Sequence, residues 1–375
     1  MASLLKDLYS QAYIETLAND ISRFYPNFNT KNFIVNIFDA SWEEKELKQR
    51  MRHISTNMHN HINLDYQKTI EVLMLCFDYR KKSKEKRDEN LALENMIFAD
   101  FVEMYGLNDF ELSMKALECF TQYSSSEFAI RVFILKYEEK TISQLKQWTK
   151  SKSEHTRRLA SEGCRSRLPW ANTLVKYKKD PTKVIEILEL LKYDSSKYVQ
   201  KSVANNLNDI SKDNIKIVKN LANKWIDKTT SLNWIIKHGC RTLLKSADKD
   251  ILKLFGYTIS NTLTISNIFV SSNVQIGDKL SFSFLLKDSK NLGKLRLEYA
   301  INFVRLKGKS SRKLFKIKEG IFDKKSLDIS KLHSFKKINT RVYYEGLHSI
   351  EFIVNGKIIH TQEFYLVKEE ISLKQ

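Results

Sequence analysis

The densest group of side chains that could do chemistry lies in residues 154–171. Four arginines fall within eleven residues of this segment, and Trp170 follows them closely. Arg158, Glu162 and Arg165 stand at positions i, i+4 and i+7, so a helix would place them on one face. Arginines beside an indole are a composition that holds phosphates and sets an aromatic ring against a nucleotide. The segment therefore indicates a nucleic-acid site.

Two residues of the same segment bear on how this helix would be placed. Gly163 has no side chain, so it would let the helix approach a neighbouring element closely. Pro169 cannot continue a helix, so we expect it to end this one and to fix the direction in which Trp170 points.

The charge balance indicates an anionic partner. The chain has 63 Lys and Arg residues against 44 Asp and Glu residues, a formal net charge of +19. Residues 257–375 carry 21 of the basic and 11 of the acidic side chains, and residues 1–256 carry the other 42 and 33. Nucleic acid is the commonest partner of such a surplus, ahead of an anionic membrane surface. A generally lysine-rich composition is the alternative explanation.

Residues 1–256 have the periodicity of helices. Apolar residues recur at steps of three and four, and charged residues fill the other positions. Basic residues at positions 131, 158, 201 and 237 each stand beside apolar positions, at spacings of 27, 43 and 36 residues. Two of these spacings match a HEAT-type helix pair of roughly 40 residues. We therefore predict an α-solenoid whose concave surface carries a ladder of Arg and Lys, although basic residues also occur on any solvated helix face.

The periodicity changes near residue 256. Residues 275–284 alternate apolar and polar side chains, as a half-buried strand does. Similar runs follow along the chain: 295–299, 313–317 and 350–354. Asn355 and Gly356 then form the sequence of a tight hairpin turn. We predict an antiparallel β-sandwich, and divide the chain into a helical domain, 1–256, and a sandwich domain, 257–375.

Three helical segments together resemble the AlkC branch of the AlkC/AlkD family of HEAT-like repeat DNA glycosylases. They are 125–131, which reads Ser-Ser-Glu-Phe-Ala-Ile-Arg, 154–171, and 199–209, which ends in Asn-Asp. Val132 and Ser166 depart from the family pattern, where we expect Pro. The C-terminal runs 297–304 and 342–344 resemble the immunoglobulin-like domain that one subgroup of the family appends. The resemblance spans nearly the whole chain, and it implies an immunoglobulin-like sandwich for residues 257–375.

The resemblance also implies an activity and three site residues. The family removes N-alkylated bases, chiefly 3-methyladenine and, in this branch, 3-methylcytosine, without deep base flipping. Glu127 and Asp209 match acidic residues of the family's site, and Trp170 matches its aromatic wall. These bases are already cationic and leave readily, so the enzyme must stabilise an oxocarbenium-like sugar and orient a water, which carboxylates can do. One carboxylate would position the water and the other would stabilise the cation. The resemblance does not assign these two roles between Glu127 and Asp209.

On this interpretation the partner is double-stranded DNA that contains alkylated bases. The side chains expected to contact it are basic residues and one histidine of the helical region: Arg131, His155, Arg157, Arg158, Arg165, Arg167, Lys201, Lys237 and Arg241. No lysine stands out as a Schiff-base nucleophile, so we expect a monofunctional glycosylase with no cofactor and no metal. We also expect the C-terminal domain to contact DNA through the basic run 305–313.

Each proposed site residue has a structural alternative. Glu127 could favour a helix N-terminus or pair with Arg131 four residues on. Trp170 could belong to the core between repeats. Asp209 is expected near a helix C-terminus, where the dipole disfavours a carboxylate, but it could cap the next turn at Ser211. For the whole chain, the alternative is a non-catalytic HEAT scaffold that binds nucleic acid or an acidic protein.

The remaining signals favour a cytosolic protein without a metal site. The four cysteines are widely spaced: Cys76, Cys119, Cys164 and Cys240. This spacing is typical of reduced thiols and not of disulfides or zinc. The N-terminus lacks the apolar core of a signal peptide, and the longest apolar runs are too short to cross a bilayer. We expect a cytoplasmic monomer that does not act on membranes.

Overall fold

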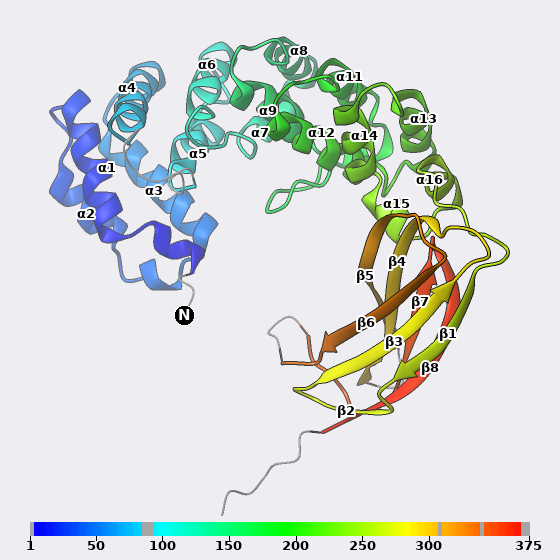
Figure 1. Ribbon diagram of the computed structural model, residues 1–375. Coiled ribbons are helices and arrows are strands. Elements are labelled where there is room, and N and C mark those ends of the chain that lie inside the picture. Colours follow the sequence, from blue (N-terminus) through cyan, green and yellow to red (C-terminus); the bar gives the residue numbers. More distant parts are fainter. Residues whose placement is uncertain (1–3, 85–92, 307–309, 338–340, 369–375) are drawn as a thin grey trace, which may run out of the picture. The chain divides into compact units, whose positions relative to one another are not determined.

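The computed structural model describes residues 4–84, 93–306, 310–337 and 341–368. Over these ranges a series of helices is followed by eight strands (Figure 1). The chain forms two compact units, Met1–Val218 with Trp225–Gly239, and Lys219–Lys224 with Cys240–Gln375. The predicted order of a helical region and then a β region is therefore confirmed.

The helices of the first unit are α1 (Gln11–Phe24), α2 (Thr30–Ile37), α3 (Leu47–His61), α4 (Tyr66–Lys84), α5 (Met96–Tyr105), α6 (Phe110–Phe120), α7 (Ile130–Lys136), α8 (Glu138–Trp148), α9 (Glu154–Glu162), α10 (Val175–Lys179), α11 (Thr182–Leu191), α12 (Lys197–Ile210) and α14 (Thr230–Gly239). Two short 3-10 helices, η1 (Leu5–Leu8) and η2 (Trp42–Glu44), also belong to this unit. Helix α13 (Ile215–Trp225) is divided between the units, and α15 (Arg241–Lys245) and α16 (Lys249–Leu254) belong to the second.

The first unit is a stack of helices in two layers. In one layer α3 packs on α5, and further along the chain α9 packs on α12 and α12 packs on α14 (Figure 1). In the other layer α4 packs on α6 and α8 packs on α11. Contacts such as those of α5 with α6 and of α8 with α9 join the layers. This arrangement confirms the predicted solenoid of HEAT-like repeats.

Helix α12 shows how the sequence pattern places its side chains. The helix begins after Ser196, whose hydroxyl accepts a hydrogen bond from the Tyr198 amide. Its buried apolar residues recur at steps of three and four: Val199, Val203, Leu207 and Ile210. Because this stripe has the period of a helix, it packs inward while Lys201 stays exposed.

The two expectations about helix α9 have different outcomes. A Cβ at position 163 would collide with the Ile130 side chain on α7, so the predicted close approach at Gly163 is confirmed. The expectation that Pro169 ends the helix is wrong, because α9 already ends at Glu162. The carbonyl groups of Gly163 and Arg165 accept hydrogen bonds from the Arg131 guanidinium instead of from amides of a further helical turn. Arg165 therefore lies beyond the helix and not on its face.

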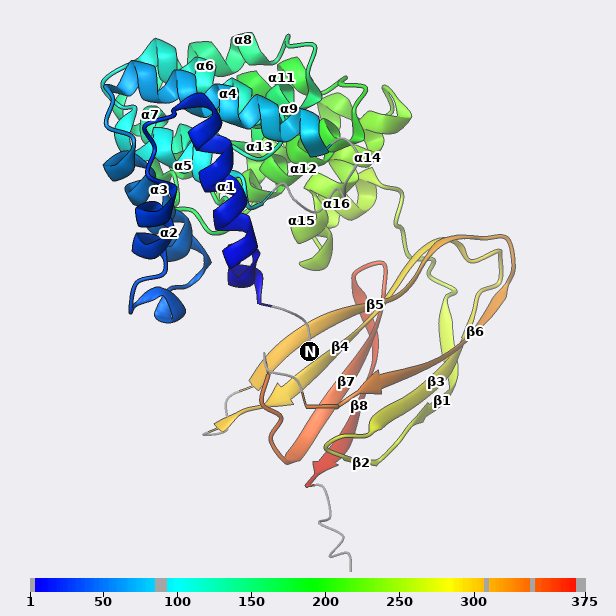
Figure 2. The same cartoon turned by 90° about the vertical axis from the view of Figure 1, so that its left-hand side faces the viewer.

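The strands of the second unit form two sheets of an immunoglobulin-like sandwich (Figure 2). One sheet has the order β1 (Thr264–Val270), β3 (Lys279–Lys287), β6 (Ser326–Ser334), and the other has the order β2 (Asn273–Gln275), β8 (Lys357–Val367), β7 (Gly346–Val354), β4 (Gly293–Val304), β5 (Ser310–Phe322). All pairings are antiparallel except that of β2 with β8. Phe282, Tyr299 and Phe352 meet in the core. Asn355 and Gly356, both with positive φ, form the predicted hairpin turn between β7 and β8.

The change from helix to strand falls between α16 and β1, around the predicted boundary at residue 256. The compact units divide earlier in the chain, because α15 and α16 group with the strands. A Cβ at Gly356, in the β7–β8 turn, would collide with Leu252 of α16 and with Ala247. The last two helices thus pack against the sandwich, and the exact domain limits remain a prediction.

Candidate active site

Three carboxylates alternate with two arginines across helices α7 to α12. The carboxylate of Glu127, just before α7, lies 2.7 Å from the Arg158 guanidinium on α9. Arg158 is also 3.7 Å from Glu162, one turn along the same helix. Glu162 lies 2.5 Å from Arg165, which in turn lies 2.8 Å from Asp209 in the last turn of α12. Segments up to 82 residues apart in sequence therefore meet in one chain of ion pairs.

The two arginines of this chain remain positively charged. Burial acts to lower the pKa of Arg158, but Glu127 and Glu162 outweigh it and raise the pKa above its ordinary value. Burial likewise acts on Arg165, and Glu162 and Asp209 raise its pKa. A buried charge needs such partners, because removal from water disfavours the charged form.

Hydroxyl groups fix the direction of the two glutamates. The Ser125 hydroxyl donates to Glu127 at 2.7 Å, and the Ser202 hydroxyl donates to Glu162 at 2.5 Å. Glu127 therefore has one arginine and a hydroxyl as partners, and Glu162 has two arginines and a hydroxyl. Such bonds hold an acidic group in one orientation before a substrate arrives, which is what electrostatic catalysis requires.

Both glutamates line one cavity of about 310 Å³. Arg158, Arg165 and the indole of Trp170 line the same space. Its other walls are apolar or hydroxyl-bearing: Leu93, Met96, Ser124, Ser125, Phe128, Leu168, Pro169 and Tyr198. The structure thus brings Glu127 and Trp170 together, as the sequence interpretation expected. A cavity with an aromatic wall and carboxylates suits a cationic ligand.

Asp209 does not line this cavity. Its side chain is 3% exposed and is held by Arg165 on one side and by Lys212, at 3.1 Å, on the other. It does not cap the turn at Ser211, whose hydroxyl donates to the Asn208 carbonyl. Asp209 therefore reaches the cavity through Arg165, and not directly.

Trp170 stands in a loop whose main chain is hydrogen-bonded to a side chain of another helix. Its φ of 62° lies in the left-handed region, and its side chain is 57% exposed, so it is not part of the inter-repeat core. The Lys48 ammonium on α3 donates to the Trp170 carbonyl at 3.0 Å and lies 4.7 Å from the centre of the Phe128 ring. Lys48 thereby ties the indole-bearing loop to a helix 122 residues away.

Arg131 holds the same loop from the other side. Its side chain is buried, and it donates to the carbonyl groups of Gly163, Arg165 and Asn172. Burial lowers the pKa of Arg131 to about 10. The expectation of a DNA contact, and the alternative of a pair with Glu127, both give way here to a structural role, because the guanidinium is buried and donates to three main-chain carbonyl groups.

Three other side chains expected to contact DNA lie on α9 or shortly after it, and each has a partner in the protein. Arg157 binds Asp194 at 2.6 Å, and Arg167 binds Asp213 at 2.7 Å. The His155 ring stands edge-to-face on Tyr198, with 5.7 Å between ring centres, and burial lowers its pKa. These side chains are partly exposed, so contact with DNA remains a prediction for them.

The last three expected contacts lie further along the chain. Lys201 is exposed on α12, and Lys237 is partly exposed on α14. Arg241 begins α15, in the second unit. Their contact with DNA also remains a prediction.

The sequence interpretation missed two residues beside this cavity. Glu162 was visible as the partner of Arg158 and Arg165 at helical spacing, but it was not assigned to the site. Lys48 carried no signal, because only the folding of α3 against the Trp170 loop brings it there.

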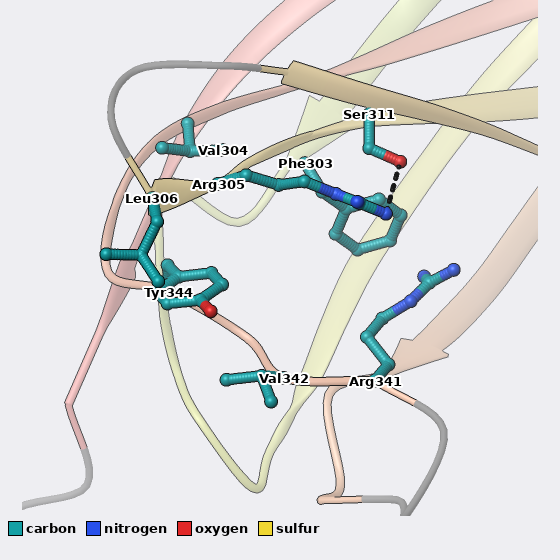
Figure 3. Close-up of a pocket in the computed structure, with 8 residues that line it drawn as sticks. All are labelled: Phe303, Val304, Arg305, Leu306, Ser311, Arg341, Val342 and Tyr344. Carbon is teal, nitrogen blue, oxygen red and sulfur yellow. Dashed lines mark hydrogen bonds between the residues drawn. The ribbon is translucent and has the colours of Figure 1, made fainter.

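The second unit has a cavity of its own, of about 450 Å³ (Figure 3). Arg305 and Arg341 both line it, together with Phe303 and the exposed side chains of Leu306 and Val342. Arg305 donates to the Ser311 hydroxyl at 3.0 Å, and the Arg341 guanidinium lies 4.3 Å from the centre of the Phe303 ring. Part of the basic run predicted to contact DNA, residues 307–309, lies outside the described residues.

The described ranges contain neither a metal-binding cluster nor a membrane-spanning helix. No group of three His, Cys, Asp or Glu side chains there could hold a metal ion. His53 pairs instead with Asp39, and His59 stacks on Tyr105. Within those ranges, no helix combines the length and apolarity needed to cross a bilayer.

Known proteins resemble this chain over almost its full length. A model of the DNA alkylation repair enzyme family matches residues 108–243, and a model of the C-terminal Ig-like domain of the uncharacterised protein YhaZ matches residues 264–368. The uncharacterised protein YhaZ of Bacillus subtilis (strain 168) is 40% identical over 362 residues, which cover 96% of this chain and 98% of that protein.

A solved structure supports the same relationship. The Pseudomonas fluorescens alkylpurine DNA glycosylase AlkC, bound to DNA containing an abasic site analog, matches 97% of this chain and 100% of its own, at 33% identity and a TM-score of 0.91. This chain therefore belongs to the AlkC-type branch of the DNA alkylation repair enzyme family, with a C-terminal immunoglobulin-like domain.

Proposed function

We propose that this protein is a monofunctional DNA glycosylase that excises cationic N-alkylated bases, 3-methyladenine and 3-methylcytosine, from duplex DNA. The observation that carries the proposal is the cavity that Glu127, Glu162 and the indole of Trp170 line together. Family membership supports the reaction class, and the solved relative is an alkylpurine DNA glycosylase bound to DNA.

The residues of the cavity suit the chemistry of a base that is already a good leaving group. A base alkylated on its ring nitrogen carries positive charge, so no acid is needed to protonate it. As the N-glycosidic bond breaks, positive charge moves to the deoxyribose, where a carboxylate stabilises it. The Trp170 π face adds attraction for the same cation. Glu127, the more exposed of the two glutamates, orients the water that attacks the sugar carbon.

The arginines of the cavity would bind phosphates of the DNA strand. In the structure Arg158 and Arg165 lie between the carboxylates and keep them paired. Both also line the cavity, where phosphates of a bound strand would pass. An arginine shared between a carboxylate and a phosphate holds the damaged nucleotide against the acidic group without a deep pocket for a flipped base.

In this proposal Asp209 does not contact the substrate and acts through Arg165. It neutralises Arg165 together with Glu162, and so fixes the guanidinium that faces the substrate. Glu127 and Trp170 keep the catalytic roles expected of them, Glu162 joins them, and Asp209 contributes through Arg165.

The lining of the cavity supports a monofunctional reaction. Among the described residues that line it, none is a lysine, the residue type that forms a Schiff base with a sugar. Borohydride treatment during turnover should trap no covalent protein–DNA adduct. A trapped adduct would identify a bifunctional glycosylase, with Lys48 as the first residue to test.

The decisive experiment measures base release from methylated duplex DNA. Wild-type protein should liberate 3-methyladenine and leave an abasic site, and Glu127→Gln should bind the same duplex but release base at least 100-fold more slowly. A non-catalytic HEAT scaffold, the alternative, would bind duplex DNA and release no base from any substrate. Equal release by wild type and Glu127→Gln would refute the site but not the activity.

A further inference from the structure

A second cavity of the helical unit, of about 680 Å³, lies where α12 and α14 begin. Its lining combines cationic, hydroxyl and aromatic side chains: Ser195, Lys197, Gln200, Lys201, Thr230, Ser231 and Trp234. Neither the ion-pair chain nor the carboxylate-lined cavity includes any of these residues. Helix α12 nevertheless connects the two sites, because Tyr198 of its first turn lines the carboxylate-lined cavity.

The cations of this second cavity differ from the arginines around α9. Lys197 and Lys201 are exposed, and they stand four residues apart, on one face of α12. Among the described side chains no carboxylate pairs with either of them, whereas Arg157 pairs with one carboxylate and Arg158 and Arg165 pair with two each. Two uncompensated ammonium groups on one face attract an anion, and not a cationic base.

The aromatic side of the cavity is held rigid. The Trp234 side chain is 45% exposed, although an indole is normally largely buried in a helical stack. The His238 ring, one turn along α14, lies nearly parallel to it, with 5.1 Å between ring centres and 4° between ring planes. His238 thereby supports one face of the indole and leaves the ring as a fixed apolar wall.

We propose that this cavity binds one sugar–phosphate unit of the DNA strand beside the damaged nucleotide. The phosphate lies between Lys197 and Lys201, and the apolar face of its deoxyribose lies against Trp234. The inference rests on the proposed function, since it takes DNA as the ligand. It adds a second anchor that reads the backbone and not the base, because lysines contact phosphates whatever the sequence.

The anchor would act together with the carboxylate-lined cavity. Both sites include residues of the first turn of α12: Lys197 lines the second cavity, and the next residue, Tyr198, lines the carboxylate-lined cavity. Fixing the neighbouring phosphate limits the movement of the damaged nucleotide relative to Glu127. Such positioning contributes to rate as well as to affinity.

The first test measures binding of the full-length protein to a duplex with an abasic-site analogue, over a range of salt concentrations. Each phosphate contact that is lost lowers the slope of log affinity against log salt by about 0.9. The Lys197→Met/Lys201→Met double variant should therefore lose about 0.9 from the slope, and about fivefold in affinity near 0.15 M salt. Lys31→Met, on an exposed position of α2, is the matched control and should leave the slope unchanged.

The second test separates the sugar contact from the phosphate contact. Trp234→Ala should weaken binding by about tenfold without changing the salt slope, and Trp234→Phe should restore most of the loss. Val35→Ala, another exposed apolar residue of α2, serves as the control. Thermal unfolding of each variant verifies that the fold is intact.

The outcomes distinguish this inference from the proposed function. A wild-type slope in the double variant, or wild-type affinity in Trp234→Ala, would overturn the second anchor whether or not the protein excises bases. Absence of base release by wild type, with these binding effects present, would refute the glycosylase and leave the anchor standing. Free dTMP should not compete below millimolar concentration. Micromolar competition that Trp234→Ala abolishes would make the cavity a mononucleotide site and contradict the proposal.

Discussion

Arginines line a cavity in each unit of this protein, but their surroundings differ. Around α9, Arg158 and Arg165 are each paired with carboxylates, and the pairs are largely buried. In the immunoglobulin-like domain, Arg305 and Arg341 contact a hydroxyl and an aromatic ring, and within the described ranges neither has a carboxylate partner. The same residue type therefore stands in two electrostatic environments.

We propose that this difference separates two tasks of the protein, base excision and DNA binding. Paired arginines hold acidic side chains in place and keep those acids usable for stabilising a cation. Unpaired arginines retain their full attraction for phosphates and bind the backbone without chemistry. On this view the carboxylate-lined cavity sets the rate, and the C-terminal cavity contributes, together with the Lys197–Lys201 anchor, to affinity and to its dependence on salt.

The strongest test of the comparison removes the acids of the helical cavity. Glu127→Gln and Glu162→Gln should each reduce the single-turnover rate of 3-methyladenine release by about 100-fold or more, with little loss of DNA affinity, because the charge that stabilises the sugar cation is lost. Glu138→Gln is the control, since Glu138 pairs with Lys176 and Lys183 away from the cavity. If both cavity variants kept the wild-type rate, the assignment of chemistry to this unit would fail.

A smaller effect on the rate is expected from Asp209, the carboxylate that pairs with Arg165 outside the cavity. Asp209→Asn should lower the rate about tenfold through a displaced Arg165, and should destabilise the fold by about 2 kcal/mol, because a buried charged hydrogen bond is weakened. Asp213→Asn, which breaks the more exposed pair with Arg167, should cost only about 0.5 kcal/mol. Rate and chemical denaturation measured on the same preparations check both values. A loss as large as that of Glu127→Gln would indicate that Asp209 acts directly on the substrate.

The tie between Lys48 and the Trp170 loop should affect turnover and not binding. Lys48→Met should reduce the single-turnover rate about fivefold and leave DNA affinity within twofold, because the indole is no longer held at the cavity. Lys48→Arg should recover most of the rate, since it can still donate to the Trp170 carbonyl. The quenching by DNA that is due to Trp170 is the difference between a protein and its Trp170→Phe variant. This difference should be smaller in Lys48→Met than in wild type. Unchanged quenching together with an unchanged rate would remove Lys48 from the site.

The C-terminal arginines should give the smallest change and only in binding. Arg305→Gln and Arg341→Gln should each lower the salt slope by about 0.9, while the rate at saturating protein stays at the wild-type value. Arg312→Gln is the control, because Arg312 is already paired with Glu351. A drop in the saturating rate, or an unchanged slope, would show that the two cavities do not divide the work as compared here.

Much of the architecture was predictable from local pattern. The three-and-four spacing of Val199, Val203 and Leu207 gives a helix with one apolar face, and Asn355 with Gly356 gives a hairpin. The resemblance to the AlkC branch predicted that Glu127 and Trp170 belong to one site, and both residues line the same cavity. Local pattern failed at Pro169, because α9 ends at Glu162 and the carbonyl groups after it accept hydrogen bonds from Arg131 of another helix.

By itself, the sequence determined the periodicity of each half, the excess of positive charge and the family to which the chain belongs. These properties depend on residue type and on neighbours a few positions away. Only the tertiary structure decided which partner each charge has: Arg131 donates to main-chain carbonyl groups, Asp209 pairs with Arg165, and Lys48 donates to the Trp170 carbonyl. The physical reason is that a charged side chain acts through the groups within a few ångströms of it, and folding draws those groups from helices far apart in the chain.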